Sequence, residues 1–162
     1  MKIAKIINNN VVSTCDEEGR EIIVMGRGVG FKAKEGSTID EEKVEKIFRL
    51  ESQNTMDKFK ELLENLPMEH VQISAEIIGY AKEVLNRPIN PNVYITLTDH
   101  INFALERYKQ KMMFSNPLIR EVRSFYHAEY LIGEYAIAMI ERDLGVKLPV
   151  DEAASIALHI VN

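Results

Sequence analysis

The sequence of 162 residues contains one cysteine, Cys15, so it cannot form an intramolecular disulfide bond. A lone thiol is typical of a protein in a reducing cytoplasm, where we expect this chain to reside. Cys15 follows β-branched residues, and we interpret it as a small strand residue rather than a reactive thiol. No apolar run is long enough to span a bilayer, and Lys2 and Lys5 interrupt any signal-peptide pattern. The sequence therefore predicts no membrane insertion.

Several motifs of nucleotide and metal chemistry are also absent. The glycine run at residues 26–30 is followed by Phe31, where a dinucleotide fingerprint would need its third glycine, and no helical pattern follows. No Gly-Lys-Ser/Thr closes a Walker A loop. The histidines lack the short spacings typical of metal-binding helices. We therefore expect neither a metal nor a cofactor.

Charge is distributed unevenly along the chain, whose net charge is −5. Residues 1–34 hold six Lys and Arg against four Asp and Glu, whereas residues 35–162 hold fourteen against twenty-one. The small basic excess at the start permits nucleic-acid binding without establishing it. The acidic remainder is typical of a regulator that contacts other proteins.

The first fifty residues read as a small sheet. Runs rich in β-branched residues predict strands at 2–7, 11–15 and 21–25. Asparagines 8–10 predict a tight hairpin turn, because Asn tolerates left-handed angles and bonds its own backbone. Gly19 supplies positive φ in the second turn, and Thr38 to Glu41 read as a capped helical turn. Residues 45–50 are ambiguous, because their apolar spacing favours a helix locally.

After the polar run 51–54, which we interpret as a linker, apolar residues recur every three or four positions. This pattern predicts six helices in a compact bundle, with a break near His127, a C-terminal glycine at Gly145 and a last helix running to Asn162. The predicted fold class is α+β with two domains, at residues 1–54 and 55–162.

The stretch from Gly26 to Phe31 is the first candidate binding site. Its glycines allow a backbone to approach another surface, and Arg27 and Phe31 can hold a phosphate and stack on a base. These residues could equally form a turn and a loop with no binding role, since asparagines in hairpins are usually turn residues and a glycine run after a strand is usually a loop.

These residues resemble a known family. MKIAKIINNNVVS and VMGRGVGF, in this order, resemble the amino-terminal RNA-binding module of the BglG/SacY-type bacterial antiterminators, and those of β-glucoside operons most. The resemblance implies a four-stranded antiparallel sheet that dimerises, so residues 45–50 become the fourth strand. It also implies that the dimer binds a hairpin in a leader mRNA and prevents a terminator from forming. The implied RNA contacts are Lys5, Asn8, Asn10, Gly26, Arg27 and Phe31.

His100 and His159 are the second candidate site. Each lies beside the apolar stripe of a predicted helix, so we expect both to edge a buried face. Three interpretations remain open on the residues alone: a structural histidine at a helix interface, a metal pair, and a phosphoryl acceptor, since a neutral imidazole is nucleophilic.

The segments 98–100 and 152–159 resemble the two histidine motifs of a PTS regulation domain. This resemblance makes His100 and His159 phosphoacceptors for proteins of the sugar phosphotransferase system, namely its phosphocarrier protein and a sugar permease. His70 and His127 match no motif and are interpreted as structural or surface residues. Family members usually carry two such domains, and this sequence stops just after His159, so we expect a fragment.

Two other functions fit the sequence less well. A histidine-dependent enzyme would use His100 with Asp99, but adjacent helical residues point about 100° apart, so Asp99 is badly placed to orient the ring. A sugar-responsive DNA-binding repressor would need a recognition helix, and the amino end is rich in strands with no helix-turn-helix pattern. We therefore expect a binding regulator and not an enzyme.

Overall fold

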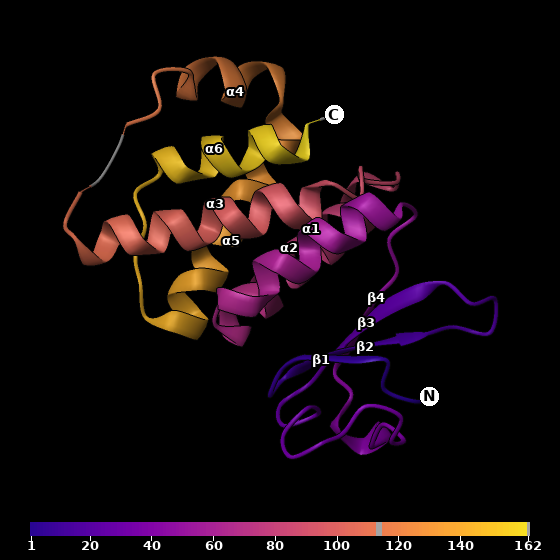
Figure 1. Ribbon diagram of the computed structural model, residues 1–162. Helices are drawn as coiled ribbons and strands as arrows, with labels where there is room; N and C mark the ends of the chain where they lie inside the picture. Colours follow the sequence, from indigo (N-terminus) through magenta and orange to yellow (C-terminus); the bar gives the residue numbers. More distant parts are fainter. Residues whose placement is uncertain (113–114, 162) are drawn as a thin grey trace. The chain divides into compact units, whose positions relative to one another are not determined.

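The computed structural model describes residues 1–112 and 115–161, and it divides into two compact units, Met1–Met68 and Glu69–Asn162. Each unit is described by itself below (Figure 1). Among the described residues, no helix combines the length and apolar character that crossing a membrane requires.

The first unit is built on an antiparallel sheet with strand order β1-β2-β3-β4. The strands are β1 (Lys5–Asn8), β2 (Val11–Cys15), β3 (Glu21–Met25) and β4 (Lys46–Phe48). The four-stranded sheet is confirmed, including the strand expected within residues 45–50. The predicted helical turn is present as a short 3-10 turn, Glu41–Lys43, and its capping residue is Asp40.

The two faces of the sheet have separate cores. Cross-strand register aligns Ile6, Val12, Val24 and Ile47 in one row, and residues around Val29 and Ile39 cover that face. Alternation places Ser13, Ile23 and Phe48 on the opposite face, where the sheet needs another element to exclude water.

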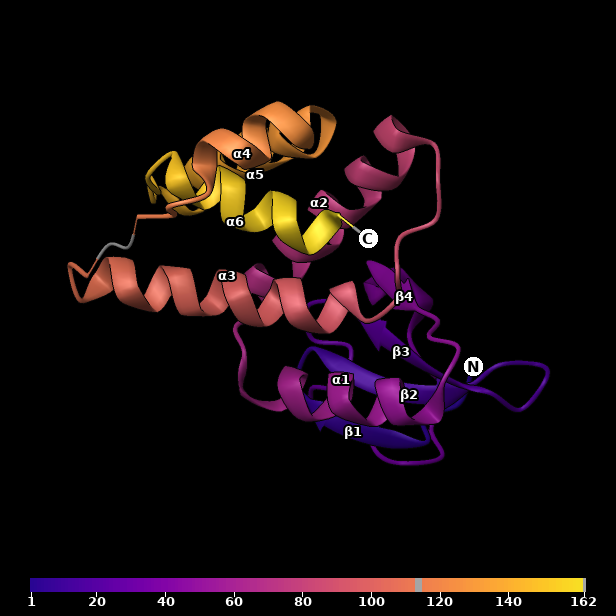
Figure 2. The same ribbon diagram turned by 90° about the horizontal axis from the view of Figure 1, so that it is seen from above.

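That element is helix α1 (Gln53–Asn65), which packs on β1 and β3 (Figure 2). Phe59 of α1 is fully buried, and its ring meets Phe48 edge-to-face with 5.0 Å between centroids. The helix begins at Gln53, inside the polar run 51–54, because the Ser52 side chain accepts a hydrogen bond from Thr55 N and caps it.

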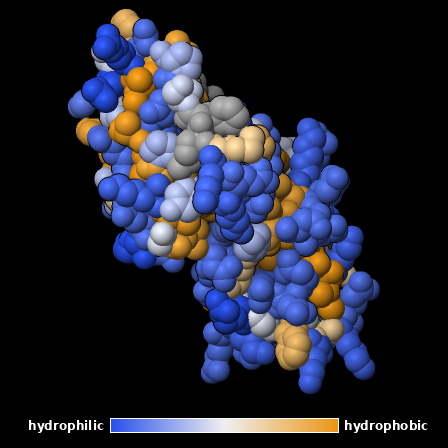
Figure 3. Space-filling model, turned by 90° about the vertical axis from the view of Figure 1, so that its left-hand side faces the viewer, coloured by the Kyte–Doolittle hydropathy of each residue, from blue (hydrophilic) through white to orange (hydrophobic). Residues whose placement is uncertain are grey.

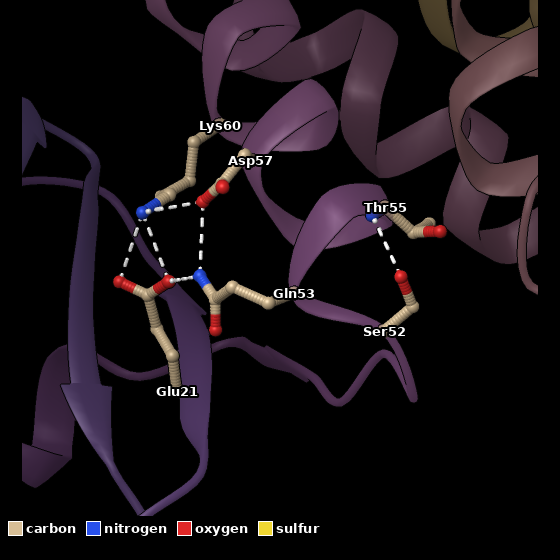
Figure 4. A network of polar contacts seen from close by, with 6 residues as sticks. All are labelled: Glu21, Ser52, Gln53, Thr55, Asp57 and Lys60. Carbon is tan, nitrogen blue, oxygen red and sulfur yellow. Dashed lines mark hydrogen bonds and ion pairs between the residues drawn. The ribbon is translucent and has the colours of Figure 1, made fainter.

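A polar network also fixes α1 to the sheet (Figure 4). Lys60 Nζ donates to both carboxylate oxygens of Glu21 on β3, at 2.9 and 3.0 Å, and Gln53 donates to the same carboxylate at 2.7 Å. By its contacts α1 therefore belongs with the sheet, in the unit Met1–Met68. The domain boundaries 1–54 and 55–162 stay a prediction.

The second unit is a bundle of five helices in its described part, so with α1 the described residues form six helices, as expected. They are α2 (Met68–Leu85), α3 (Val93–Lys109), α4 (Ile119–Phe125), α5 (His127–Leu144) and α6 (Asp151–Ile160). Its core combines apolar residues of α2, α3, α5 and α6. The break before His127 and the left-handed Gly145, with φ of 68°, are confirmed. The expected end of the last helix, Asn162, lies outside the described residues.

A close crossing of α5 and α6 places the last helix. A Cβ on Gly133 of α5 would lie 2.1 Å from the carbonyl oxygen of Ala153, so glycine is required for the two backbones to touch. Ala153, Ala154 and Ala157 are fully buried at this side of α6. Small residues therefore set the position of the α6 side chains that line the site described next.

Candidate nucleic-acid interface and histidine pocket

In the first unit, the hairpin turn and the glycine run form one rigid end of the sheet. Asn8 Oδ1 accepts from Asn10 N, and Asn10 Oδ1 accepts from Gly28 N, both at 2.8 Å. Gly30 N donates to Asn9 O at 2.9 Å. The asparagines hold the turn through their side chains, and neither Asn9 nor Asn10 takes the left-handed angles that the sequence suggested.

Two glycines of the run are needed for close packing. A Cβ on Gly26 would lie 1.7 Å from the carbonyl oxygen of Lys43, and one on Gly30 would lie 2.3 Å from that of Asn8. Gly26 is buried, and its amide donates to Asn10 O at 2.9 Å. The geometry thus explains Gly26 by packing, and its contact with RNA stays a prediction.

Three side chains of the predicted RNA set are exposed. Arg27 is exposed, and its amide donates to Glu45 Oε2 at 2.7 Å. The Phe31 ring is 54% exposed, with Lys32 Nζ 5.4 Å from its centroid. Lys5 is also exposed but begins β1, so it lies further along the strand than the end formed by the turn.

Asn8 has a second partner that the sequence did not indicate. Its Nδ2 donates to the carbonyl oxygen of Leu63 at 3.1 Å, and Leu63 lies in the last turn of α1. Carbonyls in a last helical turn lack an intrahelical donor, so Asn8 completes the end of α1. One residue therefore serves both the turn and the helix.

In the second unit, His100 of α3 and His159 of α6 meet, with 4.9 Å between ring centroids. Both are partly exposed, so the prediction that they edge a buried face is confirmed. They line a pocket of about 420 Å³ with side chains from α3, namely Thr96, Asp99, Asn102, Phe103 and Glu106.

Glu152 completes this cluster, and the sequence did not single it out. Its Oε2 lies 2.8 Å from His100 Nε2, and the residue is only 8% exposed. Glu152 lies in the first turn of α6, where the helix dipole favours a carboxylate. A usable signal was its spacing of seven from His159, which places both residues on one side of the helix.

Burial, and then repulsion from His100, lower the pKa of His159 to about 4, although Glu152 and Asp99 act in the opposite direction. His159 is therefore neutral at pH 7, and a ring nitrogen keeps its lone pair. Two imidazole rings thus lie side by side at a pocket open to solvent, and that of His159 is neutral at pH 7.

The other histidines lie elsewhere in the helical unit. His70 is buried, with Nδ1 3.0 Å from Asn102 Oδ1, and His127 is the exposed first residue of α5. Within residues 1–112 and 115–161, no three His, Cys, Asp or Glu side chains are grouped so that they could hold a metal ion.

Both parts of the chain match known protein families. Residues 1–57 match the CAT RNA binding domain and residues 75–162 match the PRD domain. The whole chain is 48% identical to the transcription antiterminator LicT of Bacillus subtilis and to a β-glucoside operon antiterminator of Dickeya chrysanthemi. It spans 58% and 57% of their lengths, that is, a little over half.

A solved structure extends the likeness to the fold. The crystal structure of GlcT CAT-PRDI is similar with a TM-score of 0.85 and 33% identity, over 99% of this chain and 98% of that one. Sequence and fold thus agree over almost the whole chain, and the chain belongs to the family that joins a CAT RNA-binding domain to a PRD domain.

Proposed function

We propose that this chain is the RNA-binding and phosphate-sensing part of a transcriptional antiterminator of a sugar operon. The sheet unit binds a hairpin in a leader mRNA and prevents a terminator from forming, and the helical unit controls this binding. Such a partner places the protein in the cytoplasm. The relatives' names support antitermination, although the chain spans little more than half of them.

The rigid end of the sheet supports the RNA half of the proposal. Arg27 and Phe31 are exposed beside a turn that is held by hydrogen bonds before any ligand arrives. A guanidinium and an aromatic ring suit the unstacked bases of a hairpin loop or bulge. Asn8, Asn10 and Gly26 belong to the same end, and Lys5 adds a phosphate contact from β1.

The meeting of His100 and His159 is the observation that carries the proposal. Helices far apart in sequence bring both rings to one open pocket, where one donor can reach either ring. The donors in this proposal are the phosphocarrier protein and the sugar permease of the phosphotransferase system. A phosphate adds up to two negative charges beside Asp99 and Glu152, which loosens the packing of α3 against α6.

A homodimer completes the proposal. Large exposed apolar side chains of the helical unit, such as Phe125 and Leu131, supply a surface for it. The face in Figure 3 is mostly hydrophilic with small apolar groups. Both faces of the sheet are covered within one chain, so a dimer that uses the sheet face under α1 requires α1 to leave.

The RNA half is tested by hairpin binding with matched variants. Arg27→Ala and Phe31→Ala should each weaken binding by about 1–3 kcal/mol, because each removes a bidentate or stacking contact. Arg120→Ala and Tyr108→Ala, which remove an exposed guanidinium and an exposed aromatic ring from the helical unit, should bind as the wild type does. Equal affinity in all four, or a preference for duplex DNA over the hairpin, would contradict the proposal.

The regulatory half is tested by phosphoryl transfer from the phosphocarrier protein. His100→Ala and His159→Ala should each remove part of the incorporated phosphate, and the double variant should remove all that enters the helical unit. Phosphorylated wild-type protein should bind the RNA hairpin more weakly than unphosphorylated protein, whereas the same treatment should leave the affinity of the double variant unchanged. Unchanged incorporation in the double variant would contradict the role of both histidines.

A further inference from the structure

The contact between Glu152 and His100 decides which nitrogen of that ring has a lone pair. Glu152 Oε2 lies 2.8 Å from Nε2, and the two side chains are 10% and 23% exposed. An ionised carboxylate only accepts hydrogen bonds, so the hydrogen between these atoms belongs to Nε2. A neutral ring with hydrogen on Nε2 has its lone pair on Nδ1.

The fold holds the Glu152 side chain beside the ring in two ways. It lies in the first turn of α6, where unpaired backbone amides favour a carboxylate. The close crossing at Gly133 fixes α6, so the carboxylate has little freedom to leave the ring. The tautomer of His100 is therefore set by backbone packing as well as by one hydrogen bond.

We propose that Glu152 is a positioning residue that directs phosphoryl transfer to Nδ1 of His100, which rests on the phosphoacceptor role proposed above for His100. Attack through Nε2 would require this hydrogen bond to break. It would also put a phosphate against a mostly buried carboxylate, where repulsion is weakly screened. Attack through Nδ1 leaves the contact between Glu152 and Nε2 intact.

The transfer is balanced in charge and atoms when phosphoramidate is the donor. The Nδ1 lone pair forms the new N–P bond, the P–N bond of phosphoramidate breaks, and the amine leaves as ammonia. The ring of His100 keeps its hydrogen on Nε2 and becomes positive. That positive charge develops next to the Glu152 carboxylate, which stabilises the product as the carboxylate of a catalytic triad stabilises an imidazolium.

The test uses phosphoramidate and the whole chain in a His159→Gln background, so that His100 is the acceptor followed at the pocket. Nitrogen-15 spectra of histidine-labelled protein give the tautomer before reaction, and phosphorus–nitrogen couplings give the isomer after it. We expect hydrogen on Nε2 before reaction and Nδ1-phosphohistidine after it. Glu152→Gln and Glu152→Ala should give mixed isomers and react about 10- to 100-fold more slowly.

Glu106→Gln is the matched control, because it removes the same charge from the same pocket without the contact to Nε2. It should keep the Nδ1 isomer. Circular dichroism checks that each Glu152 variant is folded, and the spectra of the His159→Gln protein with Glu152 intact decide the question even where a Glu152 variant is not. Nε2-phosphohistidine at His100, hydrogen on Nδ1 in the free protein, or no reaction of His100 would each overturn the role of Glu152.

The proposed function is tested separately by the phosphocarrier protein. If phosphoramidate labels Nδ1 of His100 but that protein labels neither histidine, the regulatory proposal fails and the role of Glu152 stands. If the protein labels His100 at Nε2, the regulatory proposal stands and the role of Glu152 fails.

Discussion

The contact between Lys60 and Glu21 fixes α1 to the sheet, and replacing Lys60 by methionine should loosen the helix. Lys60 Nζ reaches both oxygens of the carboxylate, and each side chain is 18% exposed. Exposed pairs contribute about 0.2–1 kcal/mol, whereas breaking a fully buried pair costs about 3–5 kcal/mol. This mostly covered pair should therefore contribute about 2 kcal/mol to the docking of α1.

Hydrogen exchange of the intact protein measures this loss directly. A docking free energy lower by about 2 kcal/mol makes the amides of α1 exchange roughly 30-fold faster, while strands β2 and β3 keep their protection. Lys58→Met is the control, because Lys58 is exposed on the same helix. Equal exchange of α1 in the Lys60 and Lys58 variants would refute the reasoning.

The pH range of the effect follows from the carboxyl group. Desolvation raises the pKa of Glu21, but hydrogen bonds from Lys60 and Gln53 outweigh it and hold that pKa below its usual 4.5. A lowered carboxyl pKa means stability that is present above the usual value and lost as pH falls through the folded value. The difference between wild type and Lys60→Met should therefore persist at neutral pH and shrink below about pH 4.5.

Two further predictions concern the helical unit. In urea unfolding, Gly133→Ala should destabilise the unit by about 1–3 kcal/mol and disturb the pairing of His159 with His100, because the new methyl group meets Ala153 O. In the same experiment Gly79→Ala should be neutral or stabilising, because the space around Gly79 is open. The lowered pKa of His159 means that the unfolded chain binds more protons between about pH 6.5 and 4. The free energy of unfolding should therefore fall by roughly 1–2 kcal/mol as the pH is lowered through that range, a value reduced because His159 is partly exposed. If His159→Gln shows the same slope of unfolding free energy against pH as the wild type, the prediction is wrong.

Local patterns predicted much of the fold. The first three strands followed from β-branched runs and the end of α5 from Gly145, whereas the fourth strand followed from the resemblance to a known family. The prediction about residues 51–54 was incomplete for a physical reason. A polar run is typical of a linker, but Ser52 is also a helix cap, and only the packing of Phe59 on Phe48 shows that α1 covers the sheet.

The candidate sites divide in the same way. Sequence placed His100 and His159 at the edges of buried faces, since helical period is a local property. The sequence could not predict the contact between Glu152 and His100, because that contact depends on how α3 and α6 cross. The apolar periodicity of each helix does not determine the crossing. Gly26 shows the opposite case, where a residue chosen for binding also has a steric role against Lys43.

The hydrogen bonds that lock the hairpin turn to the glycine run have a thermodynamic consequence. Because Asn10 and Gly28 are fixed to each other in the free protein, an RNA bound at this end would freeze little additional chain, and the protein would lose little conformational entropy on association. Charge would contribute modestly, since each neutralised phosphate of a single strand adds only about 0.7 to the slope of log K against log salt. With Arg27 and Lys5 as its cations, such an interface would respond weakly to ionic strength, and its selectivity would come from the shape of a surface that is rigid in advance.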